Sequence, residues 1–243
     1  MARGTVLKPK TGVDSVLAQV VAELKSHANP ANVAGMARYG ISAEGTLGVS
    51  VPLLRRIAKK LGRDHGLALR LWDTGIHEAR ILAPLVDDPA LVGNRQMERW
   101  VRDLDSWDMC DGLCHNLLRY TPAAFEKAAE WADADAEFVR RAGFALMAGL
   151  AVKAHEASDA QFEAFLPLIA AAACDDRNMV KKAVNWALRQ IGKRNRQLHA
   201  KAIGTAEAIG RQGSRSARWI ATDALRELHG PVVARKLGFP SER

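Results

Sequence analysis

Helical periodicity runs along almost the whole chain and restricts its fold more than any other feature. Apolar residues recur every three or four positions, and no convincing run alternates apolar and polar residues as a strand does. Short turns marked by proline, glycine or the Asp175–Asp176 pair separate the periodic segments. The pattern predicts helices over residues 13–27, 30–39, 50–62, 64–73, 77–86, 94–103, 107–119, 122–132, 135–151, 159–171, 177–192, 195–209 and 214–229. We therefore predict an all-α fold.

A weak internal repeat accompanies these helices. Four segments place a basic residue near their start and continue with small and apolar residues: EARILAPLV (78–86), VRRAGFALM (139–147), VKKAVNWALR (180–189) and ARWIATDALR (217–226). We take as equivalent points of the repeat Arg80, Asp111, Arg141, Lys182 and Arg218. Successive points are separated by 31, 30, 41 and 36 residues. Helix pairs that repeat at such intervals are typical of HEAT-like arrays.

The predicted architecture is a right-handed superhelical solenoid of HEAT-like repeats, with one set of helices lining a concave surface that we expect to bind DNA. No linker or low-complexity stretch divides the chain, so we expect a single repeat domain over residues 1–243. Residues 1–12 and 238–243 are expected to be flexible ends.

Charge is distributed unevenly along the 243 residues, whose formal net charge is +8. Residues 181–243 hold 14 Lys and Arg against four Asp and Glu, whereas residues 1–180 hold 21 against 23. A basic C-terminal third on a nearly neutral body favours a polyanionic partner such as nucleic acid, although a basic soluble surface is the alternative.

Composition and motifs exclude several other classes. The 48% hydrophobic content is typical of a globular protein, and no stretch approaches 18 uninterrupted apolar residues, so we expect a soluble cytoplasmic protein without a membrane partner. Three cysteines do not favour a disulfide framework. The chain contains no Walker loop, Rossmann fingerprint or nucleophile elbow.

The helix expected over residues 177–192 carries an unusual tryptophan. Val180, Val184, Leu188 and Ile191 share its core side. The opposite side is a basic, solvent-facing stripe made of Lys182, Trp186, Arg189 and Lys193. Either another helix covers Trp186, with a cation over its ring, or the indole is presented to a ligand that the same cations attract.

In the helix expected over residues 135–151, Arg141 lies away from the core side. Ala145 and Ala148 follow one and two turns later, so Arg141 would stand over an alanine floor that a phosphate can approach. An ordinary solvated arginine is the alternative. The neighbouring Arg140 is closer to the core edge and is expected to be structural.

The segment DSWDMCDGLCHNLL (105–118) places Asp111 at the margin of a core face, near Trp107. A partly buried carboxylate must be satisfied by a partner. Asp111 is then a structural residue bonded to a neighbouring helix, or an electrostatic or general-base residue of an active site. A metal site with Cys110, Cys114 and His115 is the third interpretation, but these cysteines fit core positions and lack a second pair.

Four blocks in order resemble the AlkD-type DNA alkylation repair glycosylases, which are built from HEAT-like repeats. They are MARYGI with GVSVPLLRRIAKKLG (36–62), SWDMCD (106–111), VRRAGFALM (139–147) and VKKAVNWALRQIGKRN (180–195). By this resemblance, Asp111 matches the catalytic Asp, Trp107 and Trp186 match the two aromatic residues of the site, and Arg141 matches the arginine beside them.

The resemblance implies a monofunctional glycosylase that excises cationic N3- or N7-alkylated purines from duplex DNA without flipping the base into a pocket. Asp111 would stabilise an oxocarbenium-like transition state, the two tryptophans would favour cationic groups, and Arg141 would hold a phosphate. Neither a metal nor an organic cofactor is implied, and we expect a monomer. DNA contacts are assigned to Lys182, Arg189, Lys193, Arg215 and Arg218.

The chain also departs from the better-known members of this family. The segment GISAEGTLGVS (40–50) contains no Phe or Trp where those members are rich in aromatic residues, and Asn178–Met179 replaces a hydrophobic pair. Two further hypotheses therefore remain: a non-catalytic binder of damaged or branched DNA, and a HEAT-type protein-interaction scaffold.

Overall fold

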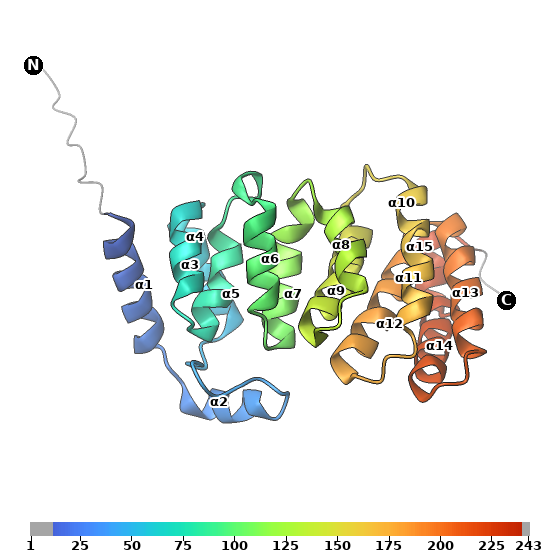
Figure 1. Ribbon diagram of the computed structural model, residues 1–243, viewed down its shortest axis with the longest axis horizontal. Helices are drawn as coiled ribbons and strands as arrows, with labels where there is room; N and C mark the ends of the chain where they lie inside the picture. Colours follow the sequence, from blue (N-terminus) through green and yellow to red (C-terminus); the bar gives the residue numbers. More distant parts are fainter. Residues whose placement is uncertain (1–11, 240–243) are drawn as a thin grey trace, which may run out of the picture. The chain divides into compact units, whose positions relative to one another are not determined.

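The computed structural model describes residues 12–239, and every regular element among them is helical (Figure 1). The prediction of an all-α fold is confirmed. The sequence predicts flexible ends at residues 1–12 and 238–243. Most of these positions, 1–11 and 240–243, lie outside the described residues.

The chain divides into two compact units, residues 1–91 and 92–243. The helices of the first unit are α1 (Val13–Ser26), α2 (Pro30–Ala37), α3 (Val51–Leu61), α4 (His65–Asp73), α5 (His77–Val86) and the short 3-10 turn η1 (Pro89–Leu91). Those of the second are α6 (Asn94–Arg102), α7 (Trp107–Asn116), η2 (Leu118–Tyr120), α8 (Ala124–Ala132), α9 (Glu137–Lys153), α10 (Asp159–Glu163), α11 (Phe165–Ala172), α12 (Asn178–Gly192), α13 (Arg196–Gly210), α14 (Arg215–Leu228) and α15 (Pro231–Leu237). That residues 1–243 form one repeat domain stays a prediction.

Beyond shifts of one or two residues at helix ends, the helices differ from the sequence-based expectation at three places. The segment 159–171 forms two helices, because Pro167 has no N–H to donate to the carbonyl four residues earlier. The segment 107–119 ends its α-helix at Asn116 and continues as η2. The sequence reading missed α15, which starts with Pro231 at its first helical position.

Helix α9 is the central helix of the second unit. It packs against α6, α7, α8 and α12, and every residue from Arg141 to Ala151 is buried. Helix α12 in turn packs against α9, α11, α13 and α14. The helices α7, α9, α12 and α14 are therefore neighbours in the second unit. One face of each helix borders a common region, where most of the predicted site residues lie.

Gly143 sets how closely α8 approaches α9. A Cβ at this position would lie 2.6 Å from the backbone nitrogen of Ala132, 2.9 Å from the carbonyl carbon of Trp131 and 3.0 Å from the carbonyl oxygen of Ala128. Because all three are backbone atoms, a larger residue can be accommodated only if the helices separate. We expect Gly143→Ala to lower the free energy of unfolding by about 1–3 kcal/mol, as measured by urea denaturation.

Gly204 provides the control for this prediction. It lies inside α13, where an added Cβ would meet nothing within 4 Å. Gly204→Ala should therefore gain roughly 0.5–1 kcal/mol of stability from its higher helix propensity. Equal stability of the two variants would contradict the close contact between α8 and α9.

A buried carboxylate organises the first unit. Glu78 of α5 is fully buried and accepts hydrogen bonds from the backbone N–H groups of Leu47, Gly48 and Val49, at 2.8, 2.6 and 3.2 Å. Gly48 has φ +78°, and a Cβ there would lie 2.3 Å from the carbonyl oxygen of Asn29. The segment 40–50 that departs from the family pattern is thus held by α5. No helix of the described residues is long and apolar enough to cross a membrane.

Candidate active site

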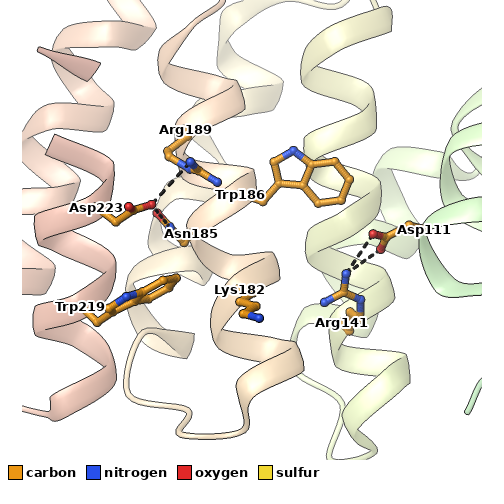
Figure 2. A pocket seen from close by; sticks show the side chains of 8 residues that line it. All are labelled: Asp111, Arg141, Lys182, Asn185, Trp186, Arg189, Trp219 and Asp223. Carbon is orange, nitrogen blue, oxygen red and sulfur yellow. Dashed lines mark hydrogen bonds and ion pairs between the residues drawn. The ribbon is translucent and has the colours of Figure 1, made fainter. Parts of the chain in front are cut away.

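A cavity of about 420 Å³ opens on the second unit between α7, α9, α12 and α14 (Figure 2). It is lined by Asp111, Arg141, Lys182, Asn185, Trp186, Arg189, Trp219 and Asp223. Five of these eight residues were predicted from the sequence as catalytic or DNA-binding. Helix packing therefore gathers residues as far apart along the chain as Asp111 and Asp223, because consecutive repeats present the same face.

Asp111 and Arg141 form an ion pair at one side of the cavity (Figure 2). The Nη2 atom of Arg141 donates to both carboxylate oxygens of Asp111, at 2.8 and 3.0 Å. The Asp111 side chain remains 24% exposed. Burial raises the pKa of Asp111 above its ordinary value, while the charge and hydrogen bonds of Arg141 oppose the rise. The arginine thus favours the ionised carboxylate in a place that otherwise disfavours it.

The predicted surroundings of Arg141 are wrong. Arg141 is only 5% exposed, and Ala145 and Ala148 are fully buried, so no open alanine floor exists. Arg141 also donates from Nη1 to the carbonyl oxygen of Met179, at 2.7 Å. The reason is that other helices cover α9 on all sides. The side that carries Arg141, which the sequence placed away from the core, is covered by α7 and α12. Arg140 bonds Asp175 and a backbone carbonyl, which confirms its structural interpretation.

Trp186 is half-buried on α12 and borders the cavity. The expected core side of this helix is confirmed, because Val180, Val184, Leu188 and Ile191 are fully buried. The indole is covered in part by His115 of α7, whose ring centroid lies 4.8 Å away at an interplanar angle of 36°. Another helix therefore covers part of the indole, as the first alternative predicts, while presentation of Trp186 to a ligand stays a prediction.

His115 is positioned by α9. Its Nε2 lies 3.2 Å from the carbonyl oxygen of Ala145, so this nitrogen carries the proton and donates. A Cβ at Gly149 would lie 3.1 Å from the imidazole, so glycine makes room for the ring. Burial lowers the pKa of His115, and nearby arginines act in the same direction. A neutral imidazole therefore backs the Trp186 indole.

Trp107 begins α7, one turn before Asp111, so the two share one face of the helix. It is half-buried. Among the described residues that line the cavity, however, Trp107 is not included. Its place in the site stays a prediction.

The predicted basic stripe of α12 is largely neutralised by α14. Arg189 pairs with Glu227 and, at 3.5 Å, with Asp223, and Lys193 pairs with Glu227 at 2.5 Å. Both cations are half-buried, so the prediction that they face solvent is wrong for these two residues. The cause is that α14 packs beside α12 and brings its acidic residues against the stripe. Lys182 is exposed, as predicted.

Arg215 and Arg218 are exposed on the first turn of α14, where Ser214 caps the helix by accepting from the N–H of Ala217 at 3.0 Å. Neither arginine lines the cavity among the described residues; Trp219 does. The sequence reading missed Trp219, Asn185 and Asp223. A signal for Trp219 existed, because aligning the blocks that begin at 180 and 217 makes it, rather than Arg218, equivalent to Lys182.

The cysteines of α7 are packing residues. Cys110 and Cys114 are fully buried, and the Cys114 thiol lies 3.5 Å from the carbonyl oxygen of Ala142 on α9. Leu113 and Leu117 are buried with them, which confirms the predicted core face. Within residues 12–239, no group of three or more His, Cys, Asp or Glu is arranged to hold a metal ion.

Comparison with solved structures identifies the fold of the protein. The chain is similar to a member of a new family of proteins related to the HEAT-like repeat DNA glycosylases, with affinity for branched DNA structures. The TM-score is 0.74 at 21% sequence identity, over 92% of this chain and 96% of that one. The protein therefore has the fold of the HEAT-like repeat glycosylases, which confirms the predicted fold class.

The sequence profile of the DNA alkylation repair enzyme family matches residues 20–228, and the chain belongs to this family. The resemblance seen in the sequence blocks is thereby confirmed. A designed armadillo repeat protein in complex with a peptide is a weaker structural match, with a TM-score of 0.35 at 14% identity over 76% of this chain and 78% of that one. No curated protein matches the sequence significantly.

Proposed function

We propose that this protein is a monofunctional DNA glycosylase that excises N3- or N7-alkylated purines from duplex DNA and leaves an abasic site. The observation that carries the proposal is the Asp111 carboxylate, held by Arg141 at the side of an open cavity that Trp186 also borders. Membership of the DNA alkylation repair enzyme family supports it.

The chemistry requires a negative charge beside the deoxyribose. An alkylated purine is cationic, so its glycosidic bond breaks with the bonding electrons passing to the base, which leaves as a neutral molecule. The sugar then carries oxocarbenium character, which a partly desolvated carboxylate stabilises more strongly than water does. Water attacks C1′, and its proton passes to Asp111 or to solvent. This reaction requires no metal or organic cofactor.

The surrounding residues have supporting roles in this proposal. The electron-rich face of Trp186 favours the cationic sugar and base, and the neutral His115 ring keeps the indole in place. Arg141 uses its donors on Asp111 and Met179, so we assign it to positioning and charging Asp111 rather than to holding a phosphate. Trp107 lies one turn from Asp111 and is proposed to contact the DNA strand that passes α7.

Phosphate contacts are proposed for the exposed cations Lys182, Arg215 and Arg218. Replacing Lys182 by Gln should weaken DNA binding about equally for all sequences, and lower the slope of log K against log salt by about 1. Fluorescence anisotropy at several salt concentrations measures both quantities. Lys193→Gln is the matched control on the same helix, because Glu227 already neutralises Lys193. An equal loss in both variants would mean that this ion pair opens when DNA binds.

Base release from alkylated DNA tests the proposal. The protein is incubated with duplex DNA that contains N-methylpurines, and the free base and the alkali-labile abasic sites are quantified. Release of 3- or 7-methylpurine above the rate of spontaneous depurination is the expected result. If folded protein binds the same DNA but releases no methylpurine, the proposed glycosylase activity is wrong.

A non-catalytic binder of branched DNA is the second candidate. The structurally similar protein described above has affinity for branched DNA. Tighter binding to a four-way junction than to alkylated duplex, without base release, is the result that would favour it.

A further inference from the structure

Trp219 is a large aromatic residue at the border of the cavity that the glycosylase chemistry does not use. It lies one turn into α14 and is 40% exposed, although tryptophan is usually well buried. In Figure 2 its indole lies on the opposite side of Lys182 from the Asp111–Arg141 pair. The cavity therefore has an aromatic wall that is separate from Trp186.

A cation lies over one face of the Trp219 ring. The Nζ atom of Lys181 lies 5.1 Å from the ring centroid, over one face. This contact favours one orientation of the indole, and a side chain with fewer orientations loses less conformational freedom when a ligand stacks on it. The indole is thus prepared to accept a flat partner.

The charges around Trp219 select an anionic ligand. Lys182 in the cavity and Arg215 and Arg218 on the first turn of α14 are exposed. The nearest acid in the cavity wall, Asp223, is already bonded by Arg226 and by the Asn185 amide at 2.7 Å. This wall therefore repels phosphate little, while three cations beside it attract phosphate.

We propose that Trp219 is a base-stacking subsite, on which an unpaired nucleobase of the bound DNA stacks while the adjacent cations hold its flanking phosphates. The proposal rests on the proposed function in that it takes DNA as the ligand. An aromatic face beside a basic groove is the arrangement that binds single-stranded nucleotides without sequence preference, because every base has a π-face. The subsite would make the protein prefer DNA with a displaced base over a perfectly paired duplex.

A fluorescent base tests this subsite directly. Two duplexes of the same sequence are compared, one fully paired and one with a single bulged 2-aminopurine, whose fluorescence falls when it stacks. The wild-type protein and Trp219→Phe should both bind the bulged duplex more tightly than the fully paired duplex, and both should quench the fluorescence of 2-aminopurine. Trp219→Ala should lose about tenfold in affinity for the bulged duplex only, together with the quenching.

Tyr120 provides a matched control. It is also an exposed aromatic residue with a cation over its ring, Arg119 at 4.8 Å, and it does not line the cavity among the described residues. Tyr120→Ala should behave as the wild type. Unchanged affinity and quenching in Trp219→Ala, or an equal loss in Tyr120→Ala, would overturn the subsite.

The two proposals can fail separately. Base release depends on Asp111, whereas bulge affinity and quenching are measured on DNA without a lesion. Quenching of 2-aminopurine without base release would contradict the proposed glycosylase activity and support the stacking subsite. Base release with no effect of Trp219→Ala on bulged DNA would remove the subsite alone.

Discussion

Replacing Asp111 by Asn is expected to slow base release from N-methylpurine DNA by on the order of 10²- to 10³-fold, the usual loss when one electrostatic stabiliser of a transition state is removed. The amide oxygen of Asn can still accept a hydrogen bond from Arg141, so the fold should persist. Removal of a negative charge beside the DNA should leave the Kd unchanged or slightly lower. Single-turnover kinetics and anisotropy separate these two quantities.

The control for this substitution is another acidic residue at the same end of α7. Asp105 is exposed and precedes the helix, and the described lining of the cavity does not include it. Asp105→Asn should release base at the rate of the wild type. Base release by Asp111→Asn at a rate close to that of the wild type would show that the reaction does not depend on this carboxylate.

The helices and their core faces could be predicted from the sequence because both depend on local periodicity. The positions of Val180, Leu188, Cys110 and Leu113 follow from which side of one helix is apolar, and all four are fully buried. The family resemblance added the order of the blocks. Local periodicity does not show how many sides of a helix are covered by other helices.

Arg141 illustrates this omission. A single helical wheel assigns it to the side away from the core, whereas α9 is covered on that side as well. The sequence contains the relevant signal, since residues 142–152 of this helix include no charged side chain. A helix that is apolar all round is a buried helix, and an arginine at its start must then find an internal partner.

The cations of α12 illustrate a second limit, because counting charges does not reveal pairs between helices. Arg189 and Lys193 bind Glu227, which lies 38 and 34 residues later. These separations match the spacing of the repeats, so complementary charges at equivalent points of successive repeats are the signal. Trp219 was missed for a related reason, because a shift of one residue in the repeat alignment moved the expected position to Arg218.

Arg141 also carries the second large prediction, since it is the ion-pair partner of Asp111. Replacing Arg141 by Met keeps the volume and removes the charge, leaving the Asp111 carboxylate and the Met179 carbonyl without this donor. Breaking a buried ion pair on one side typically costs 3–5 kcal/mol, and because Asp111 is partly exposed we expect about 3 kcal/mol at neutral pH. Urea denaturation measures this loss.

The loss should depend on pH in a defined direction. Burial raises the pKa of Asp111 and Arg141 opposes the rise, so the pKa should increase further in Arg141→Met. Above that pKa the unpaired carboxylate is charged and the variant is least stable relative to the wild type. As pH falls through the pKa of Asp111, the carboxyl becomes neutral and the difference in stability between the two proteins should decrease.

Catalysis should respond to the same shift. Base release needs the ionised carboxylate, so its decline on acidification should begin at a higher pH in Arg141→Met than in the wild type, after correction for spontaneous depurination at each pH. Arg140→Met is the matched control, because Arg140 bonds Asp175 rather than Asp111. That variant should lose stability and keep the wild-type pH profile. Identical acid limbs in the two variants would contradict the assignment of Arg141 as the residue that keeps Asp111 charged.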